Sequence, residues 1–176
     1  MSQVSLLRDQ LQQAQAFLDM SLDGVTPDQA HWAPPGKANP LSATLAHLIT
    51  GEDAFVGGML RGGAPLAAAA WAGKTGLSEP PPPPFPPQPW DQWGRRVRAD
   101  MGALRAYGQA VFAATDGYVA SLSDADLSRT LDLSAVGLGQ HTLAWVISNA
   151  VLGHRLSHWG EIACLKGLQG EQGYPF

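Results

Sequence analysis

Apolar residues recur every three or four positions in four long stretches of this chain, and this period is what most limits its fold. An α-helix places such positions on one face, whereas a half-buried β-strand would need apolar residues at every second position. We find no strand pattern of useful length between the stretches. The sequence therefore predicts an all-α protein, and four long helices favour a four-helix bundle. The predicted helices cover residues of about 4–22, 40–61, 90–120 and 142–168.

The segment of about residues 61–89 separates the second predicted helix from the third. It is rich in alanine and contains the run PPPPPFPPQP. Consecutive prolines sustain neither a helix nor a sheet ladder, so we predict an extended linker. A long crossover between helices that are not antiparallel neighbours explains it best. An alternative is an adaptor protein in which the proline run is a ligand for a signalling domain.

Composition and charge restrict the class of protein. The chain has 176 residues, of which 45% are hydrophobic and 15% are charged, which fits one globular domain over residues 1–176. A net charge of −4 with scattered Lys and Arg argues against nucleic-acid binding. We see neither a signal peptide nor an apolar run of membrane-spanning length, and Cys164 is the single cysteine. We therefore expect a cytoplasmic protein that does not bind membranes.

The last predicted helix contains HRLSH, which places His154 and His158 four residues apart. Residues at this spacing project from one side of a helix, one turn apart, and two such imidazoles can bind one metal ion. Both lie within the core-facing stripe, because several apolar residues fall within about 60° of His158. These are Leu143, Ile147, Val151, Ile162 and Leu165. The alternative is a pair of buried histidines with other hydrogen-bond partners.

A third ligand must come from another element, and His47 on the second helix is the best candidate. The bulky apolar stripe of that helix is formed by Leu41, Leu45, Leu48, Phe55, Val56 and Met59. His47 lies about 130° from the centre of this stripe. Its own face carries small residues, so that another helix can approach closely and the face is expected to be buried. These residues are Thr44, Gly51, Ala54 and Gly58. His31 is expected at the surface, and His141 is too far along the chain from His154.

Two acids are weak candidates for catalysis. Glu52 falls within the bulky stripe of the second helix, and Glu161 follows His158 by three residues. Either could orient a ligating histidine or act as a base. Each could equally be a structural carboxylate paired with an arginine, and that is the interpretation we favour.

Several runs of the sequence resemble the DinB/YfiT-like superfamily. They are LSATLAHLITGED, HWAPPGKANP and VLGHRLSHWGEIACLKGLQG, of which the last is the most specific. The resemblance implies a four-helix bundle with a long crossover between the second and third helices. It also implies a divalent metal ion, zinc or nickel, held by one histidine of the second helix and two of the last. These positions match His47, His154 and His158.

The resemblance also suggests an activity. Its characterised relatives are thiol-dependent transferases and isomerases that use thiols such as bacillithiol or mycothiol. In them the metal is thought to activate the thiol as a thiolate. We therefore expect a metal-dependent S-transferase that joins a low-molecular-weight thiol to a small electrophile, and a homodimer. The alternative is a non-catalytic, metal-binding dimer associated with stress.

Overall fold

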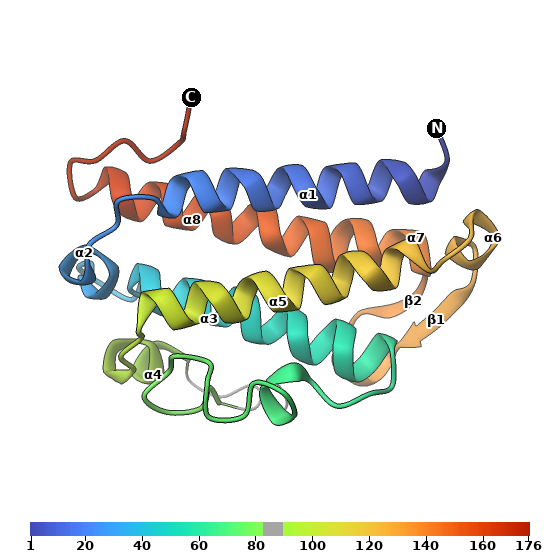
Figure 1. Cartoon of the computed structure of the whole chain (residues 1–176), viewed down its shortest axis with the longest axis horizontal. Coiled ribbons are helices and arrows are strands. Elements are labelled where there is room, and N and C mark those ends of the chain that lie inside the picture. Colours follow the sequence, from blue (N-terminus) through green and yellow to red (C-terminus); the bar gives the residue numbers. More distant parts are fainter. Residues whose placement is uncertain (83–89) are drawn as a thin grey trace.

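Four long helical stretches make up most of the computed structural model, which describes residues 1–82 and 90–176 (Figure 1). The stretches lie side by side, and α1 and α3 each pack against both α5 and α8. The predicted helical class therefore holds for most of the described chain. The long elements are α1 (Gln3–Leu22), α3 (Leu41–Glu52) with η1 (Asp53–Leu60), α5 (Met101–Ala120), and α7 (Leu143–Trp145), η4 (Val146–Gly153) and α8 (His154–Gly167) in succession. The short elements are α2 (Pro27–His31), η2 (Leu66–Ala68), α4 (Trp90–Arg96), α6 (Asp124–Leu127), β1 (Thr130–Leu133), η3 (Ser134–Val136) and β2 (Gly139–Thr142).

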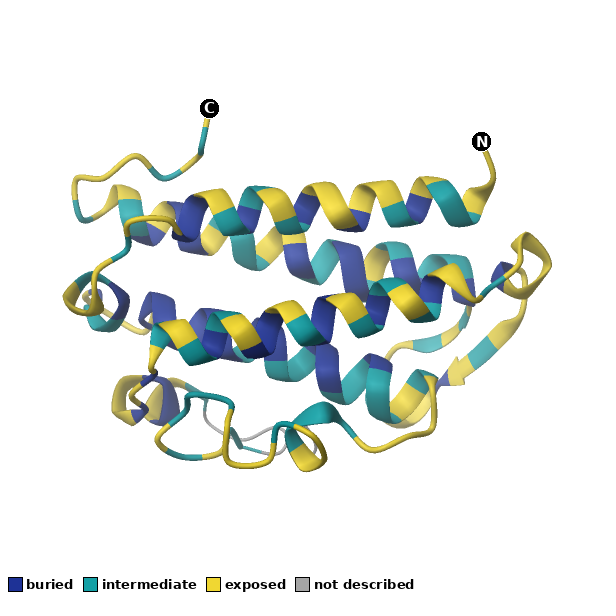
Figure 2. Ribbon diagram, viewed as in Figure 1, coloured by how far each residue is buried: buried dark blue, intermediate teal, exposed yellow. Residues whose placement is uncertain are grey.

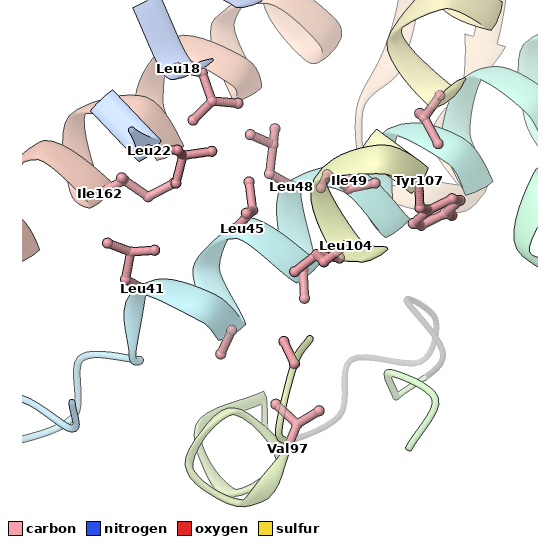
Figure 3. Packing of buried hydrophobic residues seen from close by; sticks show 14 of the residues in the cluster. Leu18, Leu22, Leu41, Leu45, Leu48, Ile49, Val97, Leu104, Tyr107 and Ile162 are labelled. Carbon is pink, nitrogen blue, oxygen red and sulfur yellow. The ribbon is translucent and has the colours of Figure 1, made fainter. Parts of the chain in front are cut away.

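The hydrophobic core lies where the apolar faces of these stretches meet (Figure 2). In α1 the apolar residues that recur every three or four positions are all buried; they are Leu7, Leu11, Ala14, Leu18 and Leu22. Burial of each leucine contributes about 1.5–3 kcal/mol, so the shared interior is the main source of stability. Figure 3 shows the part of the core that joins all four stretches. It contains Leu18 and Leu22 of α1, Leu45, Leu48 and Ile49 of α3, Leu104 of α5 and Ile162 of α8.

Most residues of α3 are buried, but the face of His47 is buried only in part, because His47 and Gly51 keep some exposure. Thr44 on that face is 5% exposed, and Leu45 on the bulky side is 1% exposed. From Asp53 the helix continues as a π-helical segment, η1, and a second π-helical segment, η4, precedes α8. The predicted second and last helices are therefore continuous but not uniformly α-helical. π-Helical turns are rare and frequently occur at functional sites.

The prediction of one helix over residues 90–120 is wrong, because the chain leaves helical geometry between α4 and α5. The backbone between α4 and α5 forms hydrogen bonds with the linker instead of a helical turn. Asp100 N donates to Gly76 O at 2.8 Å, and Ser78 N donates to Arg98 O at 2.9 Å. The Asp100 carboxylate then caps α5 by accepting from Ala103 N at 3.0 Å. The hydrogen bonds to Gly76 and Ser78, together with the N-cap Asp100, thus outweigh the helix propensity of the residues between α4 and α5.

The expectation of no strands is also wrong. β1 and β2 form an antiparallel hairpin in which Thr130 pairs with Thr142 and Leu133 with Gly139. The connection returns through η3 and two glycines with positive φ, Gly137 at 78° and Gly139 at 73°. Four residues per strand are too few for a clear alternating pattern, and this is why the sequence pattern does not reveal the hairpin.

The linker over residues 61–89 is not uniformly extended where it is described. It contains the η2 turn and an isolated antiparallel bridge between Leu77 and Ala99. Residues 83–89, which hold most of the proline run, lie outside the described residues. None of the helices in the described parts of the chain combines the length and apolarity needed to cross a lipid bilayer.

Candidate metal centre

His47, His154 and His158 lie close together between α3 and α8. His47 lies in the middle of α3, His154 is the first residue of α8, and His158 follows one turn later. One candidate ligand atom from each ring lies within 4.8 Å of the other two. The Nε2 atoms of His47 and His154 are 3.3 Å apart. Folding thus brings His47 beside two rings that lie more than 100 residues later in the sequence.

The donor set fits one divalent ion. Two nitrogens bound to an ion at about 2.0–2.1 Å in tetrahedral geometry lie about 3.4 Å apart, close to the separation of His47 and His154. Without an ion, one hydrogen bond between these two nitrogens is possible. His47 Nδ1 is buried and has no hydrogen-bond partner among the described residues. Three imidazoles without a thiolate suit zinc, nickel or another borderline ion.

A small residue of α3, Gly51, lies against the ring of His154. A Cβ atom added at Gly51 would lie 3.4 Å from Cε1 of His154. Gly51 is one helical turn beyond His47, so both residues face α8. On the other side of the cluster, the ring of Trp90 packs edge-on against His47 with centroids 4.6 Å apart. The small-residue face of α3 thus admits the histidines of α8.

Burial keeps two of the histidines in the neutral form that a metal requires. It lowers the pKa of His47 from 6.5 to about 4, and the neighbouring His158 ring adds to this effect. Burial likewise lowers the pKa of His154 to about 3, with further contributions from His158 and His47. Both rings therefore offer lone pairs at neutral pH.

His158 is oriented by Glu161, whereas the favoured interpretation of this acid, pairing with an arginine, is not seen among the described residues. Its Nδ1 lies 2.7 Å from Oε2 of Glu161. Because the carboxylate accepts a hydrogen bond, the ring carries its proton on Nδ1, and Nε2 keeps a free lone pair. Glu161 has a side chain that is 58% exposed, so it contacts the cluster from the solvent side.

Glu52 is placed outside the histidine cluster, in a buried ion pair. Its Oε1 accepts from Arg155 Nη2 at 2.6 Å and from Thr115 Oγ1 at 2.7 Å. Arg155 also donates to Leu11 O at 2.9 Å and lies 4.2 Å above the ring of Phe112. The favoured interpretation of Glu52, a carboxylate paired with an arginine, agrees with this geometry.

Sequence reasoning missed Arg155 and the group around Asp53. A signal for Arg155 did exist, since it lies four residues after Val151 and seven before Ile162, both of which are buried. Asp53 is 3% exposed and accepts from Tyr107 Oη at 2.6 Å. Burial, together with this bond, raises the pKa of Tyr107.

Asp53 also fastens the linker to the helices. Its two carboxylate oxygens accept from Leu66 N at 2.8 Å and Ala67 N at 2.9 Å.

The two remaining histidines, His31 and His141, lie outside the cluster. His31 is not simply a surface residue, because its Nε2 accepts from Ala99 N at 3.0 Å. His141 stacks on Trp145 with centroids 3.5 Å apart.

Two cavities flank the histidine cluster on either side of Gly51 and Ala54, which line both. The first, which we call the Phe55 cavity, has a volume of about 580 Å³, lies between η1 and η4 and reaches His154. Its other lining residues include Phe55, Met59, Val136, Leu138 and Ala150. The second, which we call the linker cavity, has a volume of about 650 Å³, lies between the linker and α3 and reaches His47. Its other lining residues include Thr50, Thr75, Ser78, Trp90 and Tyr107. The candidate metal centre therefore adjoins two separate spaces of small-molecule size.

Comparison with known proteins identifies the family. The family model of the DinB superfamily matches residues 10–162. The chain belongs to the DinB superfamily. The resemblance seen in the sequence is thereby confirmed at the level of the family.

This DinB-superfamily chain also resembles a solved structure, described as a conserved protein from Enterococcus faecalis. The two share 19% sequence identity with a TM-score of 0.76, over 94% of this chain and 95% of the other. At this identity the likeness shows a common fold. No curated protein matches the chain significantly.

Proposed function

We propose that the protein holds one divalent ion, zinc or nickel, at His47, His154 and His158. It would use the ion to join a low-molecular-weight thiol to a small electrophile. The observation that carries this proposal is the convergence of the three rings at a spacing suited to one ion. We further propose that the four long helical stretches are the bundle of the superfamily, with residues 61–89 as its crossover.

The surroundings of the rings support a catalytic centre. Three protein ligands leave a coordination position free for a substrate. A divalent ion bound there would lower the pKa of a thiol and so favour the thiolate. Glu161 fixes the orientation of His158, and burial keeps His47 and His154 neutral.

Two adjacent cavities suit a reaction with two substrates. In the proposed transfer the thiol sulfur forms a bond to carbon of the electrophile, and the bond from that carbon to its leaving group breaks. The leaving group departs with the bonding electron pair, and the thiol proton is released to solvent. If the thiol and the electrophile are both held beside the three histidines, they react within one complex and no longer have to meet by diffusion.

Elemental analysis of tag-free protein tests the metal site. After dialysis against zinc or nickel and then against buffer, we expect about one ion per chain in the wild type. His158→Ala should retain less than about a tenth of this, because it removes one of three ligands. His141→Ala, which removes a histidine outside the cluster, should retain the wild-type amount. A wild type with only trace metal would contradict the proposal.

Activity is tested separately by a conjugation screen. Metal-loaded protein is incubated with several low-molecular-weight thiols and with electrophiles that carry a halide leaving group, and the thioether product is measured by mass spectrometry. We expect product formation that is lost in His158→Ala and unchanged in His141→Ala. Stoichiometric metal without turnover of any pair would instead support a non-catalytic metal-binding protein.

A further inference from the structure

The Phe55 cavity has a lining that is mostly apolar. Phe55, Met59, Val136, Leu138 and Ala150 form its walls, contributed by η1, η3, η4 and the loop before β2. Met59 and Leu138 are 40% and 36% exposed, so apolar side chains also surround the opening. A space bounded in this way favours a ligand that loses little hydration on entry.

No unpaired charge faces the cavity among its described lining residues. Glu52 is the only ionisable acid there, and Arg155 and Thr115 already occupy its carboxylate. The amide of Asn149 donates to Trp145 O and to Ser148 Oγ, both at 3.0 Å. A charged ligand would therefore be desolvated without a counter-charge, at a cost of several kcal/mol.

The linker cavity differs in its chemistry. Its described lining includes the hydroxyl groups of Thr50, Thr75, Ser78 and Tyr107. Thr50 and Tyr107 already donate to Ala46 O and to Asp53, and Ser78 accepts from Arg98 N, but each hydroxyl keeps some hydrogen-bonding capacity for a polar molecule. Both linings are mainly apolar, and the described lining of the linker cavity carries more hydroxyl groups.

We propose that the Phe55 cavity binds an uncharged, mainly apolar small molecule with one end at His154. This inference assigns a chemical class to the electrophile and, in that respect, rests on the proposed function. Gly51 and Ala54 form the wall shared with the linker cavity, so the small size of these two residues brings the ligand close to the histidine cluster. Binding itself needs neither the metal nor the thiol.

The test uses the full chain in EDTA and an uncharged fluorescent probe, N-phenyl-1-naphthylamine. We expect saturable binding of one probe per chain. Ala150→Phe should weaken it at least about tenfold, because the added ring takes up space that the probe would occupy. Ala68→Phe, at an exposed residue that lines the linker cavity, should alter binding less than about twofold. Leu138→Asp places a charge at the partly exposed rim, where the fold tolerates it, and should also weaken binding about tenfold.

Four results would overturn the inference. They are the absence of saturable binding, equal loss in Ala150→Phe and Ala68→Phe, and equally tight binding of the anionic 8-anilinonaphthalene-1-sulfonate. The fourth is a wild-type dimer that Ala150→Phe dissociates in analytical ultracentrifugation, since the cavity would then be an interface with a second copy. Probe binding without metal binding would leave this inference standing and contradict only the metal site.

Discussion

At the scale of single residues, the three histidines have unequal surroundings. His158 has a carboxylate partner, Glu161, whereas Nδ1 of His47 is buried without a partner among the described residues. A carboxylate behind a ligating histidine fixes its ring and raises its basicity. Glu161 is therefore better described as a positioning residue than as the catalytic base considered from the sequence.

Replacing Glu161 should weaken metal binding without abolishing it. In Glu161→Gln we expect affinity to fall about 10- to 100-fold, as is common when an outer partner of a ligating histidine is lost. Competition with a chromogenic chelator measures this. Glu171→Gln, which changes an acid beyond the end of α8, is the control and should leave affinity unchanged. Equal affinities of wild type and Glu161→Gln would show that the bond to His158 does not support the site.

The metal-free protein should lose stability as the pH falls from about 6.5 towards 4. The pKa of His47 is about 4 and that of His154 about 3, against an ordinary value of 6.5. In this window the unfolded chain binds protons that the folded chain does not, so acid favours unfolding. The slope is at most about 1.4 kcal/mol per pH unit for each histidine.

Urea unfolding in EDTA at pH 7, 6 and 5 measures this dependence. In His154→Gln one of the two groups is gone, so the free energy of unfolding should vary less with pH. Identical pH profiles of the wild type and this variant would contradict the assignment of low pKa values to burial at the site.

At the scale of elements, the two π-helical segments and the linker surround the candidate site. η4 ends at Gly153, directly before His154, and η1 begins one residue after Glu52. Asp53, the first residue of η1, holds η2 through two backbone bonds and holds α5 through Tyr107. One carboxylate therefore connects three elements beneath the linker cavity.

Removing the hydroxyl of Tyr107 should loosen this connection. We expect Tyr107→Phe to cost about 1.5–3 kcal/mol, because the lost bond is to a charged, buried group. Hydrogen exchange should accelerate at Leu66 and Ala67, whose amides Asp53 also holds. Tyr118→Phe is a matched control, since the hydroxyl of Tyr118 is buried without a partner among the described residues. Comparable losses in the two variants would refute the connection.

At the scale of the whole molecule, Arg155 joins all four long stretches. It lies on α8, pairs with Glu52 of α3, donates to Leu11 O of α1 and lies over Phe112 of α5. It is 1% exposed and directly follows His154. The same network that holds the helices together thus fixes the helix that carries two of the histidines.

Loss of Arg155 alone should be severely destabilising. Arg155→Met leaves the Glu52 carboxylate buried without its counter-charge, which costs roughly 3–5 kcal/mol. Adding Glu52→Gln should restore part of this loss. Arg8→Met is the control, because the Arg8–Asp116 pair is partly exposed, with side chains 36% and 29% accessible, and its loss should cost less than about 1 kcal/mol. Additive losses for Arg155→Met and Glu52→Gln in denaturant unfolding would contradict the pairing.

Much of the secondary structure could be predicted, and the failures have physical causes. The stripe of α1 was predicted correctly because it depends on the local helical period. The break before α5 depends on bonds to Gly76 and Ser78, which lie about 20 residues away, so local propensity could not reveal it. The angle of about 130° assigned to His47 assumed one α-helical period through residues that in fact form η1.

The sequence by itself determined the helical stretches and the pairing of His154 with His158, because spacing along one helix fixes which side chains share a face. The tertiary structure decided that His47 meets them and that Glu52 does not, since only packing relates α3 to α8. It also decided the burial that keeps His47 and His154 neutral and the two cavities beside them. These properties depend on the separation of atoms distant in the chain, and local periodicity does not encode that separation.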